Sequence, residues 1–269
     1  MFNAGLQIDR AEFAAVSRRF GLFVRALVAN FVIVPLAAYA VVKLLQVNDL
    51  VATGLLLMAI CPGVPFVVLT GGRRKGGSHE LAVALAVVMP LLSFFTIPLV
   101  ADLILPRAER VSVPPSQLFS LLLFQLIPLL LGVLGAAFAP AIAEKLKKPL
   151  GRLTMLSLLA LVAVLAPAIV RSVAAVFGSR GIIAAIAIDV VSLTSGWLLG
   201  GPRHEERFTL GIGTGLRNPA TAMLVATTSF AGTIVSATVM TYFLVQFVGA
   251  TVFGGRGILR FLARRHAAS

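Results

Sequence analysis

GIGTGLRNPATAML, residues 211–224, interrupts an apolar segment that is long enough to cross a lipid bilayer. The stretch holds two closely spaced, helix-weakening glycines, Gly213 and Gly215, a charged Arg217, and Asn218 followed by Pro219. A proline lacks the N–H of a helix interior and disfavours the helical region for the residue before it, so we expect the helix to break here. Broken backbone at membrane depth occurs only where protein buries it or where it lines a wet cavity. We therefore expect this stretch to be the functional centre of the protein.

The composition is that of a polytopic membrane protein. Of the 269 residues, 59% are hydrophobic and 12% are charged, and the mean hydropathy is +1.01. Such a composition excludes an ordinary soluble domain. The net charge of +13 does not indicate nucleic acid binding, because the Lys and Arg residues fall in short clusters between apolar runs. We expect a lipid bilayer around the protein and no nucleic acid partner.

Several apolar segments reach the length of about 20 residues that a membrane-spanning helix needs. We predict an all-α polytopic membrane protein with about eight full transmembrane helices and an N-terminal stub. Most of the 23 Lys and Arg residues fall in alternate loops, so both termini are expected in the cytoplasm, with the protein in the plasma or inner membrane. The eight segments are 22–47, 51–70, 81–105, 116–138, 153–177, 181–199, 208–228 and 232–253.

A second interruption lies in the segment 51–70, where Cys61-Pro62-Gly63-Val64-Pro65 puts two prolines around a glycine. Each interrupted segment is the middle one of three, and the two cross the membrane in opposite directions. A pair of Gly/Pro-interrupted segments at matching positions of two halves indicates a transporter built from inverted repeats, with its site between the breaks. The alternative interpretation is that the prolines only kink packed helices.

Four stretches of the chain share the motifs of a known family. They are Met1-Phe2-Asn3-Ala4-Gly5-Leu6, Gly54-Leu55-Leu56-Leu57 leading into Cys61-Pro62-Gly63, Gly196-Trp197-Leu198-Leu199-Gly200, and Gly215-Leu216-Arg217-Asn218. In these stretches the chain resembles the bile acid:sodium symporter family. The resemblance implies a core domain of two inverted three-helix repeats, whose broken middle helices cross, beside a panel domain. Alternating access would come from the core moving against the panel.

On this resemblance, residues 22–105 form core repeat one and residues 180–256 form core repeat two, with panel helices in residues 116–178. Residues 1–21 would be the remnant of a panel helix with a cytoplasmic loop, and residues 257–269 a cytoplasmic tail. In that family the Met-Phe-x-x-Gly-Leu stretch follows a complete helix, whereas here it begins the sequence. Either Met1 is internal to a longer protein, or the panel is reduced. A reduced panel would leave apolar faces for a partner, such as a second copy, to cover.

The resemblance also implies where a sodium ion would bind. The family supplies oxygen ligands from a Ser-Asn pair after the first break, from a Ser and a Thr on the next helix, and from a Glu and a Gln at the second break. Sodium is a hard cation that needs such oxygen atoms. We therefore expect no sodium coupling, no cofactor and no metal site. The corresponding positions here, none with a side-chain oxygen, are Val67, Val68, Ala82, Ala86, Gly213 and Arg217.

Arg217 is a permanent cation at membrane depth, which costs about 2.5 to 3.5 kcal/mol on an insertion scale, so it should face a cavity or a partner. In one interpretation its guanidinium presents a positive charge and five donors to an anionic substrate, a carboxylate or a sulfate. In the other it bonds to backbone carbonyls freed by the two breaks, and both interpretations can hold together. The substrate-binding residues that we predict beside Arg217 are Thr214, Asn218, Gly63 and Pro65.

Two further charges, Arg171 and Asp189, lie inside apolar segments. Each is nine residues from Arg180 along a hairpin, which places both about 13 Å below the outer helix ends. One interpretation is an intramembrane ion pair. The other makes Asp189 a proton-coupling carboxylate, or a counter-ion to Arg217 when the site is empty.

We find no Ser/His/Asp arrangement, phosphate loop or metal-ligand spacing, so we do not expect an enzyme. The sequence predicts a secondary transporter or facilitator of a small organic anion, with its site between the two breaks. The competing class is a non-transporting membrane scaffold or subunit that has the same fold.

Overall fold

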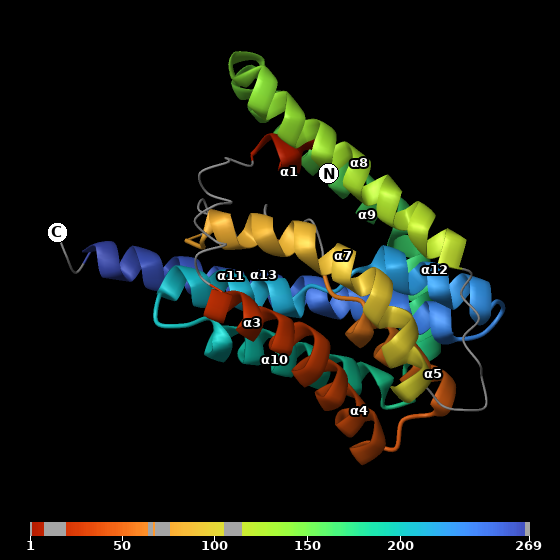
Figure 1. Cartoon of the computed structure of the whole chain (residues 1–269). Helices are drawn as coiled ribbons and strands as arrows, with labels where there is room; N and C mark the ends of the chain where they lie inside the picture. Colours follow the sequence, from red (N-terminus) through yellow and green to blue (C-terminus); the bar gives the residue numbers. More distant parts are fainter. Residues whose placement is uncertain (1, 8–19, 64–66, 68–75, 105–114, 267–269) are drawn as a thin grey trace.

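The computed structural model describes residues 2–7, 20–63, 67, 76–104 and 115–266, and in these residues it is built from helices (Figure 1). The prediction of an all-α fold is therefore confirmed for the described part of the chain. In order the helices are α1 (Phe2–Leu6), α3 (Phe20–Val28), the π-helix η1 (Ala29–Ile33), α4 (Val34–Leu44), α5 (Asp49–Ile60), α7 (His79–Ile104), α8 (Pro115–Phe138), α9 (Pro140–Val176), α10 (Gly181–Leu199), α11 (His204–Gly215), α12 (Pro219–Ser229) and α13 (Val235–His266).

Three helical stretches in the described residues are long and apolar enough to cross a membrane: Phe20–Leu44, Gly181–Leu199 and Val235–Gly255. A fourth is α7, if its two parts, bent by 49° near Ser93, are counted as one span. Other predicted segments form shorter apolar helices, such as Asp49–Ile60. The polytopic membrane class is thus supported by several spans, while the number of eight and the inverted repeats remain predictions.

The outer surface of the helices carries large apolar side chains, as a lipid-facing surface does. In water such an apolar surface would mark an interaction site, whereas lipid tails solvate it without cost. This distribution agrees with the composition of the chain and places the protein in a bilayer. Examples of exposed apolar side chains are Phe95, Phe124, Phe138, Val164, Phe177 and Leu198.

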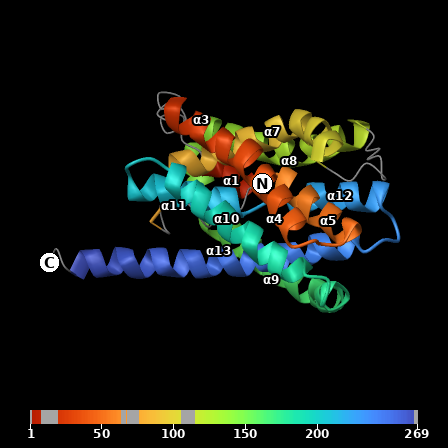
Figure 2. The ribbon, with the colours of Figure 1, turned by 90° about the horizontal axis from the view of Figure 1, so that it is seen from below.

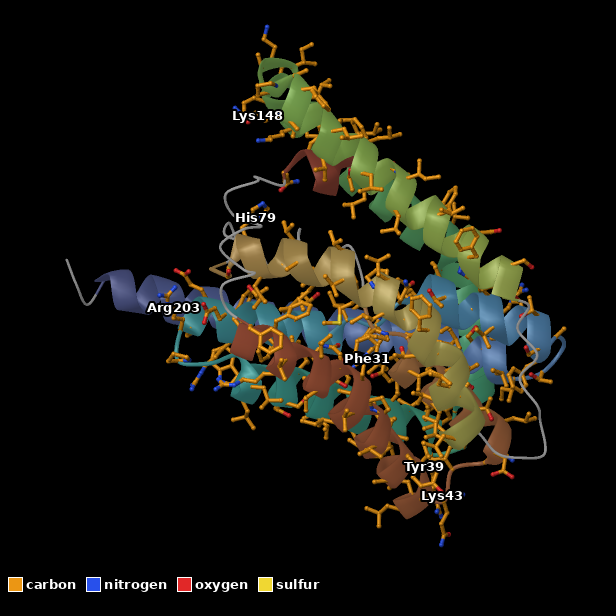
Figure 3. The ribbon with its side chains drawn as sticks, viewed as in Figure 1. Phe31, Tyr39, Lys43, His79, Lys148 and Arg203 are labelled. Atoms are coloured by element: carbon orange, nitrogen blue, oxygen red, sulfur yellow. The ribbon has the colours of Figure 1, made fainter. Side chains whose placement is uncertain are left out.

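The helices α1, α8 and α9 lie together along one side of the molecule, and α8 runs along the upper edge in Figure 1. α1 meets α8 where Gly5 faces Gly132, since a Cβ added to either glycine would overlap backbone atoms of the other helix. Facing small residues of this kind let helix backbones approach closely inside membranes. At the end of α1, Gln7 O accepts a hydrogen bond of 2.8 Å from His79 Nε2 of α7 (Figure 3). The short N-terminal helix α1 is therefore packed against α8, and the residue that follows it bonds to α7.

The predicted span 22–47 is a helix with a π-helical turn in its middle. In this turn the N–H of Val34 bonds to the carbonyl of Ala29, five residues back. The next donor in that register would be Pro35, which has no N–H, so the carbonyl of Asn30 has no intrahelical partner. Asn30 is fully buried, and its carbonyl must find another donor.

Both predicted interruptions are present in the structure. α5 ends at Ile60, and α11 ends at Gly215 before α12 begins at Pro219. Asn218 starts α12 by accepting hydrogen bonds at Oδ1 from the N–H groups of Ala220 (3.1 Å) and Thr221 (3.3 Å). Asn followed by Pro is a good helix start, because the amide caps free N–H groups and proline needs none at the first position.

The bundle has two ends that differ in their charged residues. Figure 3 shows Lys43 and Tyr39 at one end of α4, away from Arg203 and His79 near the opposite end. The last turns of α13 continue beyond the bundle toward the C-terminus in both Figure 1 and Figure 2. Which end faces the cytoplasm remains a prediction from the distribution of Lys and Arg.

Candidate functional site

The two interruptions lie against each other and share backbone hydrogen bonds. Pro62 and Arg217 form an antiparallel bridge, and Asn218 N donates to Cys61 O over 2.8 Å. The side chain of Gln246 on α13 satisfies both backbone groups of Arg217: its Oε1 accepts from Arg217 N (2.8 Å) and its Nε2 donates to Arg217 O (3.2 Å). Ser93 of α7 donates to Pro62 O over 3.2 Å. The broken backbone that sequence reasoning expected to need partners is thus held by side chains from α7 and α13.

The Arg217 side chain is fully buried at this crossing. Its Nη1 donates to Asn30 O and to Ala59 O, each over 3.2 Å. The Asn30 carbonyl is free because of the π-helical turn, and the Ala59 carbonyl lies in the last turn of α5, where carbonyls lack helical donors. A cation is also stabilised at the negative, C-terminal end of a helix. Arg217 therefore does bond to carbonyls that the helices leave free, but only one of its guanidinium nitrogens, Nη1, makes these bonds.

The other edge of the guanidinium has no hydrogen-bond partner among the described residues. Arg217 Nε and Nη2 are both buried and neither donates a hydrogen bond within the described residues. These two nitrogens lie on one side of the planar group, opposite Nη1, and form the pair that binds both oxygens of a carboxylate. Buried donors are normally satisfied, so this unpaired edge is an unusual feature of the fold.

Asp189 of α10 lies near Arg217, although no salt bridge joins the two among the described residues. Its side chain is 2% exposed, and its Oδ1 has no hydrogen-bond partner in the described structure. Gly249 makes room for it, since a Cβ there would overlap Asp189 Oδ2, whereas a Cβ on Gly215 would be in ordinary contact with Oδ1 at 3.8 Å. Arg217 lies near enough to interact electrostatically with the carboxylate. Asp189 and Arg217 thus lie together in the buried interior near the end of α11.

The expected ion pair between Arg171 and Asp189 is not formed. Arg171 is exposed on α9, and no ion pair joins it to Asp189 in the described structure. The equal distance of both residues from Arg180 along the chain did not indicate the direction of their side chains around the helix axes. The charge that faces Asp189 is Arg217.

The other predicted binding residues have structural contacts. Thr214 Oγ1 accepts a hydrogen bond of 3.3 Å from Asn30 Nδ2, and Asn218 Oδ1 caps α12. Gly63 has φ +90°, and a Cβ there would lie 2.6 Å from Met89 Cβ, so no other residue fits. Pro65 lies outside the described residues. Thr214, Asn218 and Gly63 therefore help to build the crossing around Arg217, and their role in substrate binding stays a prediction.

The positions that the resemblance assigns to sodium ligands pack together as an apolar cluster. Val67, Ala82 and Ala86 are buried in one hydrophobic core. A Cβ on Gly213 would lie 2.9 Å from Leu85 Cδ1 and 3.2 Å from Val67 Cγ2. These residues do not fit a sodium ion, which needs oxygen atoms. Val68 lies outside the described residues, and within those described no three His, Cys, Asp or Glu side chains gather as metal ligands would.

Sequence reasoning missed three residues of this site: Asn30, Gln246 and Tyr242, all buried. Tyr242 lies near Asp189, Arg217 and Ser192. The available signal was a lone polar side chain inside an apolar run, together with Pro35 five residues after Asn30. Such residues usually mark a pathway or an interhelical contact.

Comparison with known proteins gives the family. Residues 1–175 match the Sodium Bile acid symporter family, SBF. The chain is also 27% identical over 165 residues to the "Uncharacterized sodium-dependent transporter YocS" of Bacillus subtilis (strain 168), an alignment that covers 61% of this chain and 50% of the relative. The chain thus spans about half the length of the curated relative that it matches.

These comparisons agree with the motifs found in the sequence, and both descriptions are of transporters rather than enzymes. The family match ends before α10, so Asp189, Arg217 and Gln246 lie beyond the matched residues. The helical fold, the apolar spans and the match over 175 residues lead to one conclusion. The chain belongs to the Sodium Bile acid symporter family.

Proposed function

We propose that the protein is a secondary transporter or facilitator of small organic carboxylates, and that it works without sodium. The observation that carries this proposal is the free Nε–Nη2 edge of the fully buried Arg217. A carboxylate would accept two parallel, charge-assisted hydrogen bonds from this edge. The site lies where the two interrupted helices meet, which is where inverted-repeat transporters bind their substrates.

The packing around the second interruption supports the absence of sodium coupling. The positions that would hold sodium are filled by the apolar cluster of Val67, Ala82, Leu85 and Ala86 against Gly213. Arg217 Nη1 instead brings a fixed positive charge to the carbonyl of Ala59 at the end of α5. A bound cation is therefore not needed to balance the C-terminal end of that helix.

Transport by the purified protein in proteoliposomes tests the proposal. The probes are the carboxylates [14C]pyruvate and [3H]glycocholate, and exchange of labelled for unlabelled probe is measured in sodium chloride and in choline chloride. We expect equal exchange in both salts for one or both probes. Arg217→Gln should lower exchange by about 10- to 100-fold, because a hydrogen bond to a charged group contributes about 1.5 to 3 kcal/mol.

The control is Arg171→Gln, which removes an exposed arginine of α9 and should leave exchange unchanged. If Arg217→Gln does not yield monodisperse protein, Arg217→Lys takes its place, because lysine keeps the charge but lacks the planar pair of donors. Wild-type exchange by both Arg217 variants would refute the binding role, and a strict sodium requirement would refute sodium independence. No exchange of either probe by the wild-type protein would favour the non-transporting scaffold.

A further inference from the structure

Asp189 is the buried acid that the carboxylate-binding role of Arg217 leaves unexplained. It is the only ionisable residue of α10, and it lies inside the bundle with one oxygen unpaired. Gly249 admits its carboxylate, since a side chain there would overlap Asp189 Oδ2. A carboxylate at membrane depth that has no partner costs several kcal/mol, so its presence calls for a role.

Two groups from neighbouring elements face Asp189. Arg217, between α11 and α12, is the cation, and Tyr242 of α13 brings a neutral hydroxyl. From α5, Cys61 faces Arg217 rather than Asp189. Arg171 of α9 is exposed and forms no ion pair with Asp189. Among the described residues, the charge balance at this crossing therefore depends on Arg217 and Asp189.

The number of charges limits what the crossing can bind. With Asp189 ionised, the charges of Arg217 and Asp189 sum to zero. A carboxylate bound to Arg217 would then leave a net negative charge in the buried interior. Uncompensated charge in such surroundings is strongly unfavourable. If Asp189 takes up a proton, the sum returns to zero with the anion bound. The free oxygen of Asp189 also lies beside Gly215 at the C-terminal end of α11, where negative charge is destabilised.

We propose that Asp189 is the proton-coupling residue of the transporter, so that one proton enters the site with each carboxylate. This inference rests on the proposed function and names its coupling ion. Without substrate, ionised Asp189 balances Arg217; with substrate, the Asp189 carboxylate gains a proton to become a carboxylic acid, and the anion takes its place beside Arg217. The proton leaves when the anion leaves.

Accumulation of [14C]pyruvate or [3H]glycocholate in proteoliposomes under a pH gradient, acid outside, tests the coupling. At one proton per anion, a gradient of one pH unit supports up to about tenfold accumulation, since one unit corresponds to about 1.4 kcal/mol. Asp189→Asn mimics the protonated acid and should abolish this accumulation. Its exchange rate should also lose the pH dependence that we expect in the wild type, which is faster exchange at acidic pH.

Asp49→Asn is the matched control, because Asp49 is exposed at the start of α5. It should accumulate the probe as the wild type does, while protein-free liposomes measure passive entry. If Asp189→Asn does not fold, proton uptake by the wild-type protein decides: addition of pyruvate or glycocholate in unbuffered detergent solution should remove about one proton per bound anion.

The outcomes separate this inference from the proposed function. Exchange without gradient-driven accumulation in the wild type, or binding without proton uptake, would overturn the role of Asp189 and leave the carboxylate transporter standing. Wild-type accumulation by Asp189→Asn would do the same. No exchange of either probe by the wild-type protein would overturn both.

Discussion

At the scale of single residues, the site is held by side chains that replace missing backbone partners. Gln246 presents a carbonyl oxygen and an amide nitrogen to the backbone of Arg217, as a neighbouring strand would. Asn218 caps the next helix, and Arg217 Nη1 binds two carbonyls that the helices cannot use. Each of these bonds satisfies a backbone group that would otherwise be buried without a partner, at a cost of about 1 to 3 kcal/mol.

Gly63 gives a prediction at this scale. Gly63→Ala should destabilise the protein in detergent, because φ +90° disfavours a side chain and because the new Cβ would press on Met89. The backbone conformation alone costs about 1 to 2 kcal/mol, and the contact adds to it. The measurement is the melting temperature followed by tryptophan fluorescence of the purified variant.

Gly178→Ala is the matched control for Gly63→Ala. Gly178 also has a positive φ, +84°, but a Cβ there would meet nothing within 4 Å. Its melting temperature should therefore fall less than that of Gly63→Ala. Equal losses would show that the contact with Met89 contributes nothing.

At the scale of elements, irregular helices create the site. The π-helical turn η1 and the end of α5 each leave one carbonyl without a helical donor. Arg217, which follows α11, donates a hydrogen bond to both carbonyls. Pro35 has a part in this arrangement because it cannot donate to Asn30. A regular helix over residues 20–44 would have used the Asn30 carbonyl internally and left Arg217 with one fewer acceptor.

The packing of α1 on α8 gives the prediction at the element scale. Gly132→Ala should loosen α1, because its Cβ would overlap the backbone of Phe2 and crowd Gly5. The measurement is hydrogen exchange by mass spectrometry of a peptide that contains residues 2–7, which should exchange faster in this variant.

Gly135→Ala is the control for this prediction, since its Cβ would lie 3.4 Å from the flexible end of Leu6, which is ordinary contact. Exchange in residues 2–7 should then match the wild type. Unchanged exchange in Gly132→Ala would contradict the close approach of the two helices.

At the scale of the whole molecule, the distribution of Lys and Arg predicts the orientation in the membrane. We expect a fluorescent reporter fused after Ser269 to be active in the cytoplasm, because the loops on that side hold most of the positive charge. A periplasm-active phosphatase fused after Gly178, at the turn between α9 and α10, should be active on the outer side. The opposite pattern for the two fusions would invert the predicted topology.

From the amino-acid sequence alone, the chain could be assigned to the polytopic membrane proteins and its two helix interruptions could be located. Proline and glycine act locally, so the interruptions at Pro62 and at Arg217 to Pro219 could be read from the chain and are present in the structure. The apolar segments gave the helices, because length and hydropathy are properties of a continuous stretch. The family motifs are local in the same way, and two of the four, at residues 1–6 and 54–63, lie within the residues that match the family.

The residues that surround Arg217 could be identified only from the tertiary structure. Asn30, Ala59, Asp189 and Gln246 come from four different helices, and their meeting depends on rotation about helix axes that no local pattern records. For the same reason depth along the chain paired Arg171 with Asp189, whereas packing turned Arg171 outward. The sequence shows that a charge lies inside the membrane, but its partner is chosen by how the helices pack.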